Sequence, residues 1–212
     1  MLKNKLIGIT LSGAILLMGS SIAFADTVNV NKSSDEIIPI SAPVNEDSSK
    51  SFVTEFADIK DHWAYDEIVS LEEKGIWEDL SGEFAPKEMV TGTEFYIYLD
   101  KIFDFDAEVD LGFELEEEVS RMEAAMAVKK SFEAKKLAVI MRQMFPIYED
   151  TEDLAQEETS ALSFVFNTGI MKGKADGKFF PNDSITKAEL AVILDRTLST
   201  LENASPIEEL TE

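Results

Sequence analysis

The residues with the clearest catalytic potential give little support for an enzyme. His62 is the only histidine in the chain, so general acid–base chemistry would depend on it and one of many acids. It precedes Trp63 at the expected start of a helix, where packing or capping is the simpler role. No serine lies in the Gly-x-Ser-x-Gly turn of a hydrolase triad, and the chain has no cysteine nucleophile. We therefore predict a protein without catalytic residues.

Two further patterns suggest ligand chemistry but lack the spacing that it needs. Lys172-Gly173-Lys174 lacks the glycine and the hydroxyl residue of a phosphate-binding loop, so it is interpreted as a turn. Residues 104–116 alternate acidic and apolar side chains, which predicts a short half-buried strand or an extended arm. A calcium site is the functional alternative there, although no Asp-x-Asp-x-Asp-Gly loop fixes its ligands. We predict no cofactor and no metal.

The net charge of the chain limits the classes of molecule that it can bind. The 42 acidic and 19 basic residues give a formal charge of −23, so a nucleic acid would be repelled before contact. Because so many acids offer carboxylate pairs on every helix, such pairs are no specific sign of glycosidase chemistry. Without cysteine, core packing alone must hold the 212 residues in one compact domain or two small ones.

The N-terminal residues predict export. Two lysines precede an apolar stretch that ends near Met18, and Ala23-Phe24-Ala25 supplies small residues where a signal peptidase cleaves. The apolar stretch is shorter than the ~20 residues of a membrane span, which favours a cleaved signal over residues 1–25. Residues 26–50 hold too little apolar surface to fold alone and are predicted to be a flexible spacer. No later stretch is apolar enough for stable membrane insertion.

A helical unit recurs three times with the same spacing. In each copy a phenylalanine is followed by an apolar residue, a hydroxyl residue and, ten residues after the phenylalanine, a glutamate. The hydroxyl residue and the glutamate form a capping box, which marks the start of a helix. The copies are Phe84, Val90, Thr91 and Glu94; Phe113, Val119, Ser120 and Glu123; and Phe179, Ile185, Thr186 and Glu189.

Three helices are expected in the first two thirds of the chain. Asp61 is expected to cap a short amphipathic helix before Gly75, and a second helix should run from Thr91 to about Phe103. The stretch from Val119 to Phe145 has neither Gly nor Pro and predicts one long helix or two abutting ones. One straight helix would group five cations on one side, either as a binding surface or as a solvated face: Arg121, Lys129, Lys135, Lys136 and Arg142.

Several motifs together resemble the S-layer homology family. The first set is Phe56-Ala57-Asp58-Ile59, His62-Trp63-Ala64, Lys74-Gly75-Ile76, Phe84-Ala85-Pro86 and Val90-Thr91. The second set is Asp176-Gly177-Lys178-Phe179-Phe180-Pro181 and Ile185-Thr186-Lys187-Ala188-Glu189. The resemblance covers about residues 52–201 and implies a mainly α, pseudo-trimeric helical domain of three helix-loop-helix repeats. In that family the grooves between repeats hold secondary cell-wall polymer, often pyruvylated.

The middle repeat departs from this pattern. Only 15 residues separate Phe103 from Val119, too few for an upstream helix and its loop. The predicted division of the chain is a signal peptide (1–25), a spacer (26–50), a first repeat (51–104), a truncated second repeat with a long helix (105–145), a third repeat (146–201) and an acidic tail (202–212).

The resemblance also implies a set of binding residues. The family's basic position after the capping residue is occupied by Gly92, Arg121 and Lys187. The predicted polymer-binding residues are Arg121, Lys187, Trp63, Asp176 and Gly177, while Thr91, Glu94, Ser120, Glu123, Thr186 and Glu189 are predicted to cap helices. Trp77 and Phe180 are further stacking candidates, with core packing as the alternative.

These assignments predict the effects of three substitutions. Arg121 can bind a carboxylate with two hydrogen bonds, so Arg121→Ala is expected to weaken wall retention by ~1.5–3 kcal/mol without loss of helix. Lys187→Ala is expected to do less, because an ammonium group cannot form that paired contact. Gly92→Arg is expected to strengthen retention by restoring a cation.

Two functions remain open at this point. The first is an exported, non-catalytic protein of the cell wall or surface layer that binds wall polymer or a peptidoglycan-linked glycan. The second is a degenerate relative that binds another surface protein instead of polymer.

Overall fold

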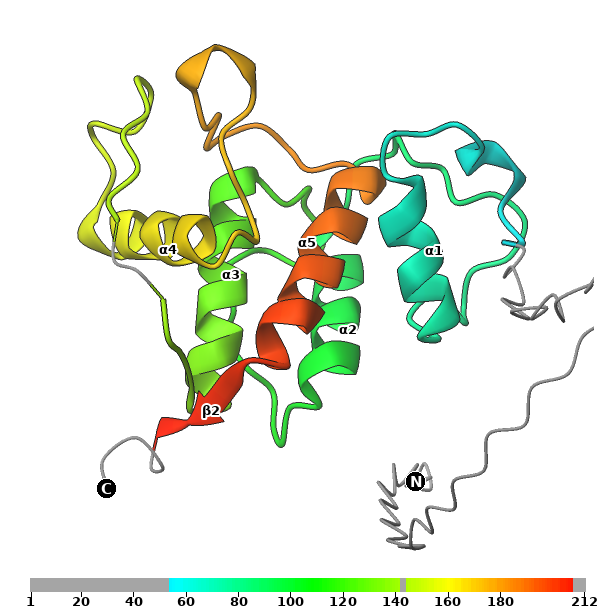
Figure 1. The fold of residues 1–212 in the computed structure, drawn as a ribbon, viewed down its shortest axis with the longest axis horizontal. Coiled ribbons are helices and arrows are strands. Elements are labelled where there is room, and N and C mark those ends of the chain that lie inside the picture. Colours follow the sequence, from blue (N-terminus) through cyan, green and yellow to red (C-terminus); the bar gives the residue numbers. More distant parts are fainter. Residues whose placement is uncertain (1–53, 142–143, 208–212) are drawn as a thin grey trace, which may run out of the picture. The chain divides into compact units, whose positions relative to one another are not determined.

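The computed structural model describes residues 54–141 and 144–207. The predicted signal peptide and spacer, together with Arg142, lie outside the described residues. Helices dominate the described part, as predicted (Figure 1). The elements are η1 (Ala57–Ile59), α1 (Tyr65–Glu73), α2 (Gly92–Phe103), α3 (Arg121–Ala134), β1 (Leu137–Val139), α4 (Gln156–Asn167), η2 (Ala175–Gly177), α5 (Lys187–Leu201) and β2 (Ala204–Pro206).

Three helices begin in the same way. Thr91, Ser120 and Thr186 are the N-caps of α2, α3 and α5, and each side chain accepts a hydrogen bond from the backbone amide three residues later. The glutamate at that third position accepts from the backbone amide of the cap, which completes a capping box in every case. Local sequence therefore fixes where the three helices start.

A ring of three hydrogen bonds joins the segments that precede these helices. The Val90 amide donates to the Ile185 carbonyl at 3.0 Å, and the Val119 amide donates to the Val90 carbonyl at 2.9 Å. The Ile185 amide closes the ring by donating to the Val119 carbonyl at 2.9 Å. All three side chains are buried, so the ring satisfies backbone groups that water cannot reach.

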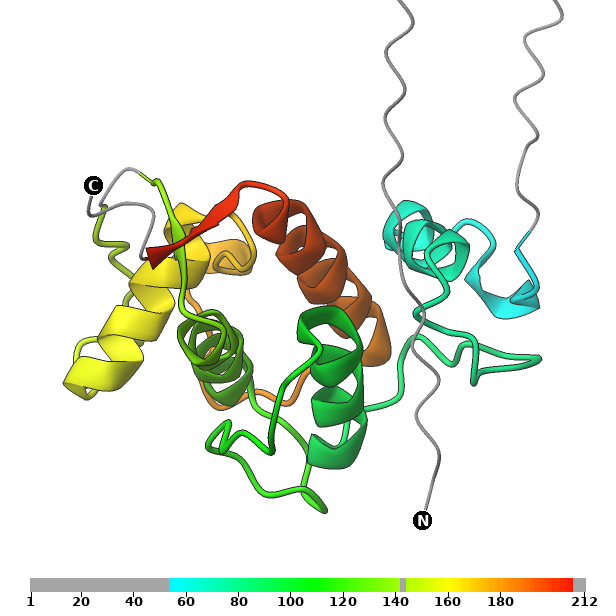
Figure 2. The same cartoon turned by 90° about the horizontal axis from the view of Figure 1, so that it is seen from below.

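The remaining helices lie on the outside of this centre. In Figures 1 and 2, α1 and α4 lie on opposite sides of α2, α3 and α5, with α1 packed against α5 and α4 against α3. The core fills the space where the capped helices meet. Its fully buried residues include Phe95, Leu99, Val128, Phe132, Leu190 and Leu194.

An extended segment crosses α2 instead of a third outer helix. The Val109 amide donates to the Tyr96 hydroxyl at 3.2 Å, and the Phe113 ring lies 5.7 Å from the Phe95 ring. Phe105 and Val109 are partly buried while most acids of residues 104–116 are exposed. This agrees with the expected extended arm; no strand is assigned within residues 104–116.

Two aspartates hold the loops ahead of the capped helices. The Asp58 carboxylate accepts from the amides of Phe84 and Ala85 at 2.8 and 2.7 Å. The Asp150 carboxylate accepts from the equivalent amides of Phe179 and Phe180 at 2.9 and 2.7 Å. Burial opposes ionisation of both acids, but the amide hydrogen bonds outweigh it and lower the pKa of each below its ordinary value.

Two local predictions are wrong. The helix expected to reach Phe145 ends at Ala134, because Lys136 adopts a left-handed backbone (φ 52°) and β1 then pairs antiparallel with β2. The expected cationic face is therefore not a feature of one helix.

Asp61 does not cap α1, since it also has a positive φ (62°), and the His62 imidazole accepts from the Ala64 amide there instead. Among the described residues, no helix is long and apolar enough to cross a bilayer.

Candidate functional site

A groove of about 310 Å³ follows one face of α5. Its lining includes Trp63, just before α1, and the loop of residues 170–174. Arg121, the first residue of α3, also contributes to the lining. Glu189, Val192, Ile193 and Arg196 line it from α5, because residues three and four apart share one helix face.

Arg121 is held by backbone carbonyls in this groove. Its side chain is only 5% exposed, its Nε donates to the Phe179 carbonyl at 2.8 Å and its Nη2 donates to the Lys172 carbonyl at 2.9 Å. The guanidinium lies over the Phe179 ring at 4.9 Å, and its Nη1 is 3.9 Å from Glu189. Burial lowers the pKa of Arg121, an effect that Glu189 and Asp183 partly offset. These contacts give Arg121 a structural role that its sequence position did not reveal.

The accessible cations of the groove come from residues that sequence reasoning missed. Lys172, Lys174 and Arg196 are exposed and line the groove. The Lys174 ammonium lies 3.0 Å from Glu189, the groove's acidic residue. The spacing of Lys172-Gly173-Lys174 predicts only a turn, and the signal that points to these cations is their position just ahead of the Asp176-Gly177 motif.

Trp63 presents an aromatic surface at the edge of the groove. Its side chain is 65% exposed, and the His62 ring lies 5.4 Å away. Trp77 is only 2% exposed and donates its Nε1–H to the Ile68 carbonyl at 3.0 Å, so it belongs to the core. Phe180 is partly buried in the loop that Asp150 holds. Of these three aromatic residues, Trp63 alone lines the groove.

The other predicted binding residues lie elsewhere. Lys187 pairs with Glu88 at 2.7 Å and lies 3.8 Å from Glu94, beside a cavity of only about 10 Å³. Asp176 and Gly177 are exposed residues with φ of 69° and 70°, and they shape the tip of the loop without lining the groove. The structure therefore brings together Trp63 and Arg121 but not the remaining three.

Gly92 cannot take the missing cation without a cost to the fold. A Cβ at this position would lie 2.2 Å from the Glu114 carbonyl oxygen and 2.8 Å from the Leu115 Cα, both backbone atoms. The extended arm passes directly over the start of α2, so a side chain has no room. Gly92→Arg would therefore have to displace the arm, and the expectation that it strengthens binding stays a prediction.

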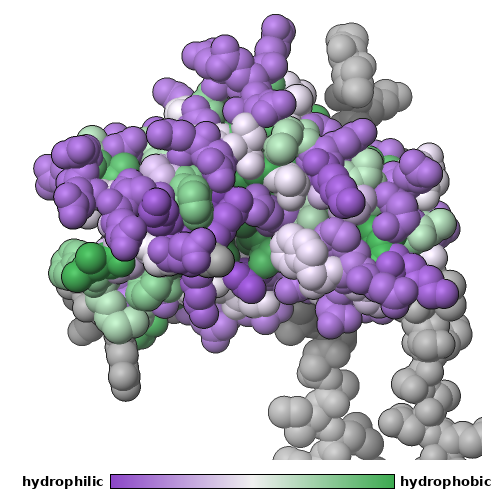
Figure 3. All heavy atoms as spheres, turned by 90° about the horizontal axis from the view of Figure 1, so that it is seen from above, coloured by the Kyte–Doolittle hydropathy of each residue, from purple (hydrophilic) through white to green (hydrophobic). Residues whose placement is uncertain are grey.

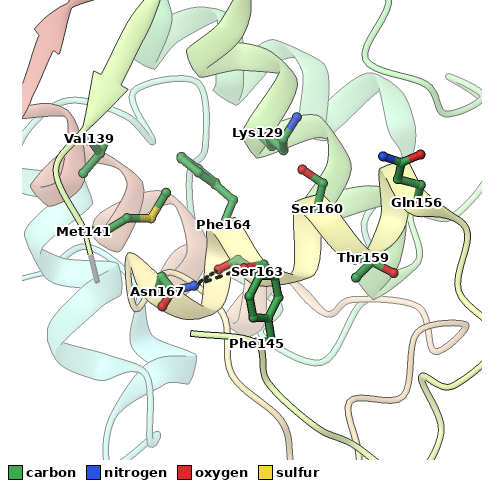
Figure 4. A pocket seen from close by; sticks show the side chains of 10 residues that line it. All are labelled: Lys129, Val139, Met141, Phe145, Gln156, Thr159, Ser160, Ser163, Phe164 and Asn167. Carbon is green, nitrogen blue, oxygen red and sulfur yellow. Dashed lines mark hydrogen bonds between the residues drawn. The ribbon is translucent and has the colours of Figure 1, made fainter. Parts of the chain in front are cut away.

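One face of the molecule is largely polar. Figure 3 shows this mainly hydrophilic face, with small hydrophobic areas between polar side chains and a larger one at the lower left. A separate cleft of about 590 Å³ lies between α3 and α4, lined by Lys129, Phe164 and polar residues of α4 (Figure 4). Near it, Ile140 and Ile147 are 87% and 94% exposed. Within the described ranges, no group of three or more His, Cys, Asp or Glu side chains could hold a metal ion.

Comparison with known proteins supports the expected family. Residues 148–191 match the S-layer homology domain, and this segment includes α4, the loop with Lys172 and Lys174, and the start of α5. The predicted resemblance is thus confirmed for this segment. The chain is 26% identical over 160 residues to a surface-layer 125 kDa protein of Lysinibacillus sphaericus. It is also 26% identical over 164 residues to an endoglucanase of Bacillus sp. strain KSM-635.

These similarities cover most of this chain but little of the relatives. They extend over 73% and 76% of the chain, and over 11% and 14% of the surface-layer protein and the endoglucanase. The two relatives share this region although their names describe different roles. The similarity therefore concerns a module rather than either whole protein.

Proposed function

We propose that this protein is a non-catalytic surface protein that binds the bacterial cell wall through an anionic glycan. The observation that carries the proposal is the groove along α5, whose lining combines three exposed cations with an exposed tryptophan. Aromatic faces stack on sugar rings, and lysine and arginine bind carboxylate or phosphate groups. A pyruvylated secondary cell-wall polymer combines both kinds of group.

The negative charge of the protein explains why binding must depend on short-range contacts inside the groove. The chain carries a formal charge of −23, so an anionic polymer is repelled at long range. At physiological salt this repulsion is screened beyond about 8 Å, and short-range contacts then decide the affinity. A cluster of cations inside a groove can provide such contacts even in an acidic protein.

The endoglucanase relative does not make this chain an enzyme. Its name describes a protein of which the similarity covers 14%. The sequence offers no nucleophile elbow and a single histidine, and His62 supports the start of α1 through the Ala64 amide. A zymogram with wall or glucan substrates is expected to show no degradation.

Retention on purified wall sacculi tests the proposal. The parent protein should be retained on sacculi with intact polymer and lost from polymer-stripped sacculi. The double variant Lys172→Ala/Lys174→Ala should bind at least about 30-fold more weakly, because each of the two lost charge-assisted hydrogen bonds costs at least about 1 kcal/mol. The double variant Lys60→Ala/Lys87→Ala removes two exposed cations outside the groove and is the matched control.

A second pair of variants tests the aromatic edge. Trp63→Ala should lower retention, whereas Phe145→Ala removes an exposed aromatic residue away from the groove and should not. Equal retention of the parent on intact and stripped sacculi would overturn the proposed function.

The surface beside α2 supports a second candidate function, which is the binding of another surface protein. A cleft of about 400 Å³ lies beside α2, where Tyr96, Val109 and Phe113 provide an apolar lining. Glu108 and Asp110 add acidic groups to the same lining. This chemistry fits a protein segment that presents apolar and basic side chains. The parent should capture such a partner on polymer-free material. Leu115→Asp changes a residue that lines this cleft and should abolish capture, whereas Ile147→Asp lies outside the cleft and should not. If the parent captures no partner in the absence of polymer, this second function is excluded.

A further inference from the structure

The groove along α5 continues into a second cleft of about 430 Å³. Lys172 and Arg196 line both clefts, so they mark the junction. Beyond the junction the second cleft is lined by Ser199, Thr200 and Asn203 at the end of α5 and just past it. Asn167, Thr168 and Gly169 line it from the end of α4, and Val139, Ile140 and Met141 add an apolar part to the lining. We call this second cleft the distal subsite.

The two clefts together are long. They follow α5 from Glu189 to Asn203, just past the helix end. At a helical rise of about 1.5 Å per residue, this distance is about 21 Å. One monosaccharide would occupy only a part of it, whereas a chain of several units would fill it.

The polar groups of the distal subsite suit an internal part of a sugar chain. The Ser199 and Thr200 hydroxyls donate to the carbonyls of Asp195 and Arg196, which leaves their oxygens as acceptors for sugar hydroxyls. The Asn203 side-chain amide donates to the Ser199 carbonyl, which leaves its oxygen as an acceptor in the same way.

Cations supply the complementary donors at the junction. The Arg196 guanidinium carries five N–H donors, and its Nη1 contacts the Ile170 carbonyl at 3.4 Å. Arg196 and Lys172 are both exposed, so they can meet an anionic substituent on the unit that crosses from one cleft to the other.

We infer that the distal subsite binds further units of the anionic polysaccharide chain that occupies the groove beside Trp63. The inference rests on the proposed function and extends it, because it makes affinity depend on the length of the chain bound. A ligand of one repeating unit reaches the groove alone, and longer fragments reach both clefts.

Charge substitutions at Ser199 test the inference, because this exposed residue lines the distal subsite only. The probes are purified wall-polymer fragments of one repeating unit and of several units. Ser199→Glu should weaken binding of the long fragments by about three- to fivefold, and Ser199→Lys should strengthen it by a similar factor. Neither should change binding of the single unit. Ser81→Glu and Ser81→Lys place the same charges on an exposed loop outside both clefts and should change neither.

The outcomes separate this inference from the proposed function. If Trp63→Ala weakens all fragments while both Ser199 variants bind the long fragments like the parent, the distal subsite is excluded and the wall-binding function stands. If the Ser199 variants change the single unit equally, the two clefts act as one site and the inference fails. If the parent binds no fragment of either length, the proposed function fails together with the inference. Circular dichroism of each variant confirms that it is folded.

Discussion

Arg121 joins three parts of the chain that are distant in sequence. Its guanidinium binds the carbonyls of Lys172 and Phe179 and stacks on the Phe179 ring, so it fixes the loop that carries the groove's lysines to the start of α3. A buried charge is tolerated when it is hydrogen-bonded and paired, and here two carbonyls accept from the guanidinium while Glu189 lies 3.9 Å from Nη1. These contacts make Arg121 a residue that positions the groove.

Arg121→Ala is expected to destabilise the fold before it affects binding. The substitution removes the donors to the buried Phe179 carbonyl and the partly buried Lys172 carbonyl, so the free energy of unfolding should fall by about 2–4 kcal/mol. Lys187→Ala breaks a more accessible ion pair with Glu88 and should cost less than about 1 kcal/mol. Denaturant unfolding followed by circular dichroism measures both. A stable Arg121→Ala protein that loses only wall retention would instead show a direct ligand contact.

The extended arm occupies the side of α2 on which a third outer helix would be expected. Residues 104–116 cover α2 with Val109 and Phe113 and close over Gly92, whose lack of a side chain permits the approach. The Gly92 and Thr93 amides donate to the Glu117 and Leu115 carbonyls at 2.9 and 2.7 Å, which anchors the arm to the helix start. A short segment thus protects part of an apolar helix face without forming a helix.

Gly92→Ala is expected to lower stability rather than leave it unchanged. Its Cβ would meet the Glu114 carbonyl oxygen at 2.2 Å, so the arm must shift, at a cost of about 1–3 kcal/mol. Ser81→Ala, at an exposed loop position, is the control and should change stability little. Thermal unfolding compares them, and a Gly92→Ala protein as stable as the parent would mean that the arm is not closely packed.

Asp58 and Asp150 should make the stability of the domain sensitive to acid. Their folded-state pKa values lie below the ordinary value, so their contribution is present at neutral pH and is lost as pH falls from about 4 through the folded-state pKa. Asp58→Asn and Asp150→Asn should each lower the free energy of unfolding by about 1–3 kcal/mol at pH 7. The variants should also lose less stability than the parent between pH 5 and pH 3, approximately. Parallel pH profiles of variant and parent would contradict this role.

Local signals made most of the helical framework predictable from sequence. The capping boxes at Thr91, Ser120 and Thr186 depend on residues three apart, and α2 accordingly has the predicted bounds. The end of α3 was missed because β1 pairs with a strand about 67 residues further along the chain, which no local pattern encodes. The contacts of Arg121 with Lys172 and Phe179 are equally remote, so its burial was not predictable from its position after a cap.

The groove was predictable only in part, because several of its residues come together through contacts that are remote in sequence. Trp63 and Arg121 were identified from motifs, whereas Lys172 and Arg196 gain their meaning from the way the loop folds back along α5. Lys187 has the expected sequence position, but Glu88 comes close enough to pair with it only in the folded chain. Motif position thus identified the region of the site and not which cations remain accessible.

The acidic excess of the protein predicts opposite effects of salt on its stability and on its binding. A formal charge of −23 favours expansion of the chain at low ionic strength, so the melting temperature should rise as NaCl increases from about 10 to about 200 mM. Between about 150 mM and about 1 M NaCl, where the long-range repulsion is already screened, wall retention should fall, because salt then screens the cations of the groove from an anionic polymer. Since the described residues contain no cluster able to hold a metal, CaCl₂ at matched ionic strength should raise the melting temperature no more than NaCl does. A larger rise with millimolar calcium would reveal a specific ion site and restore the calcium interpretation of residues 104–116. Retention that increases with salt above about 150 mM would show that polymer binding depends on Trp63 and apolar contacts instead of on Lys172, Lys174 and Arg196.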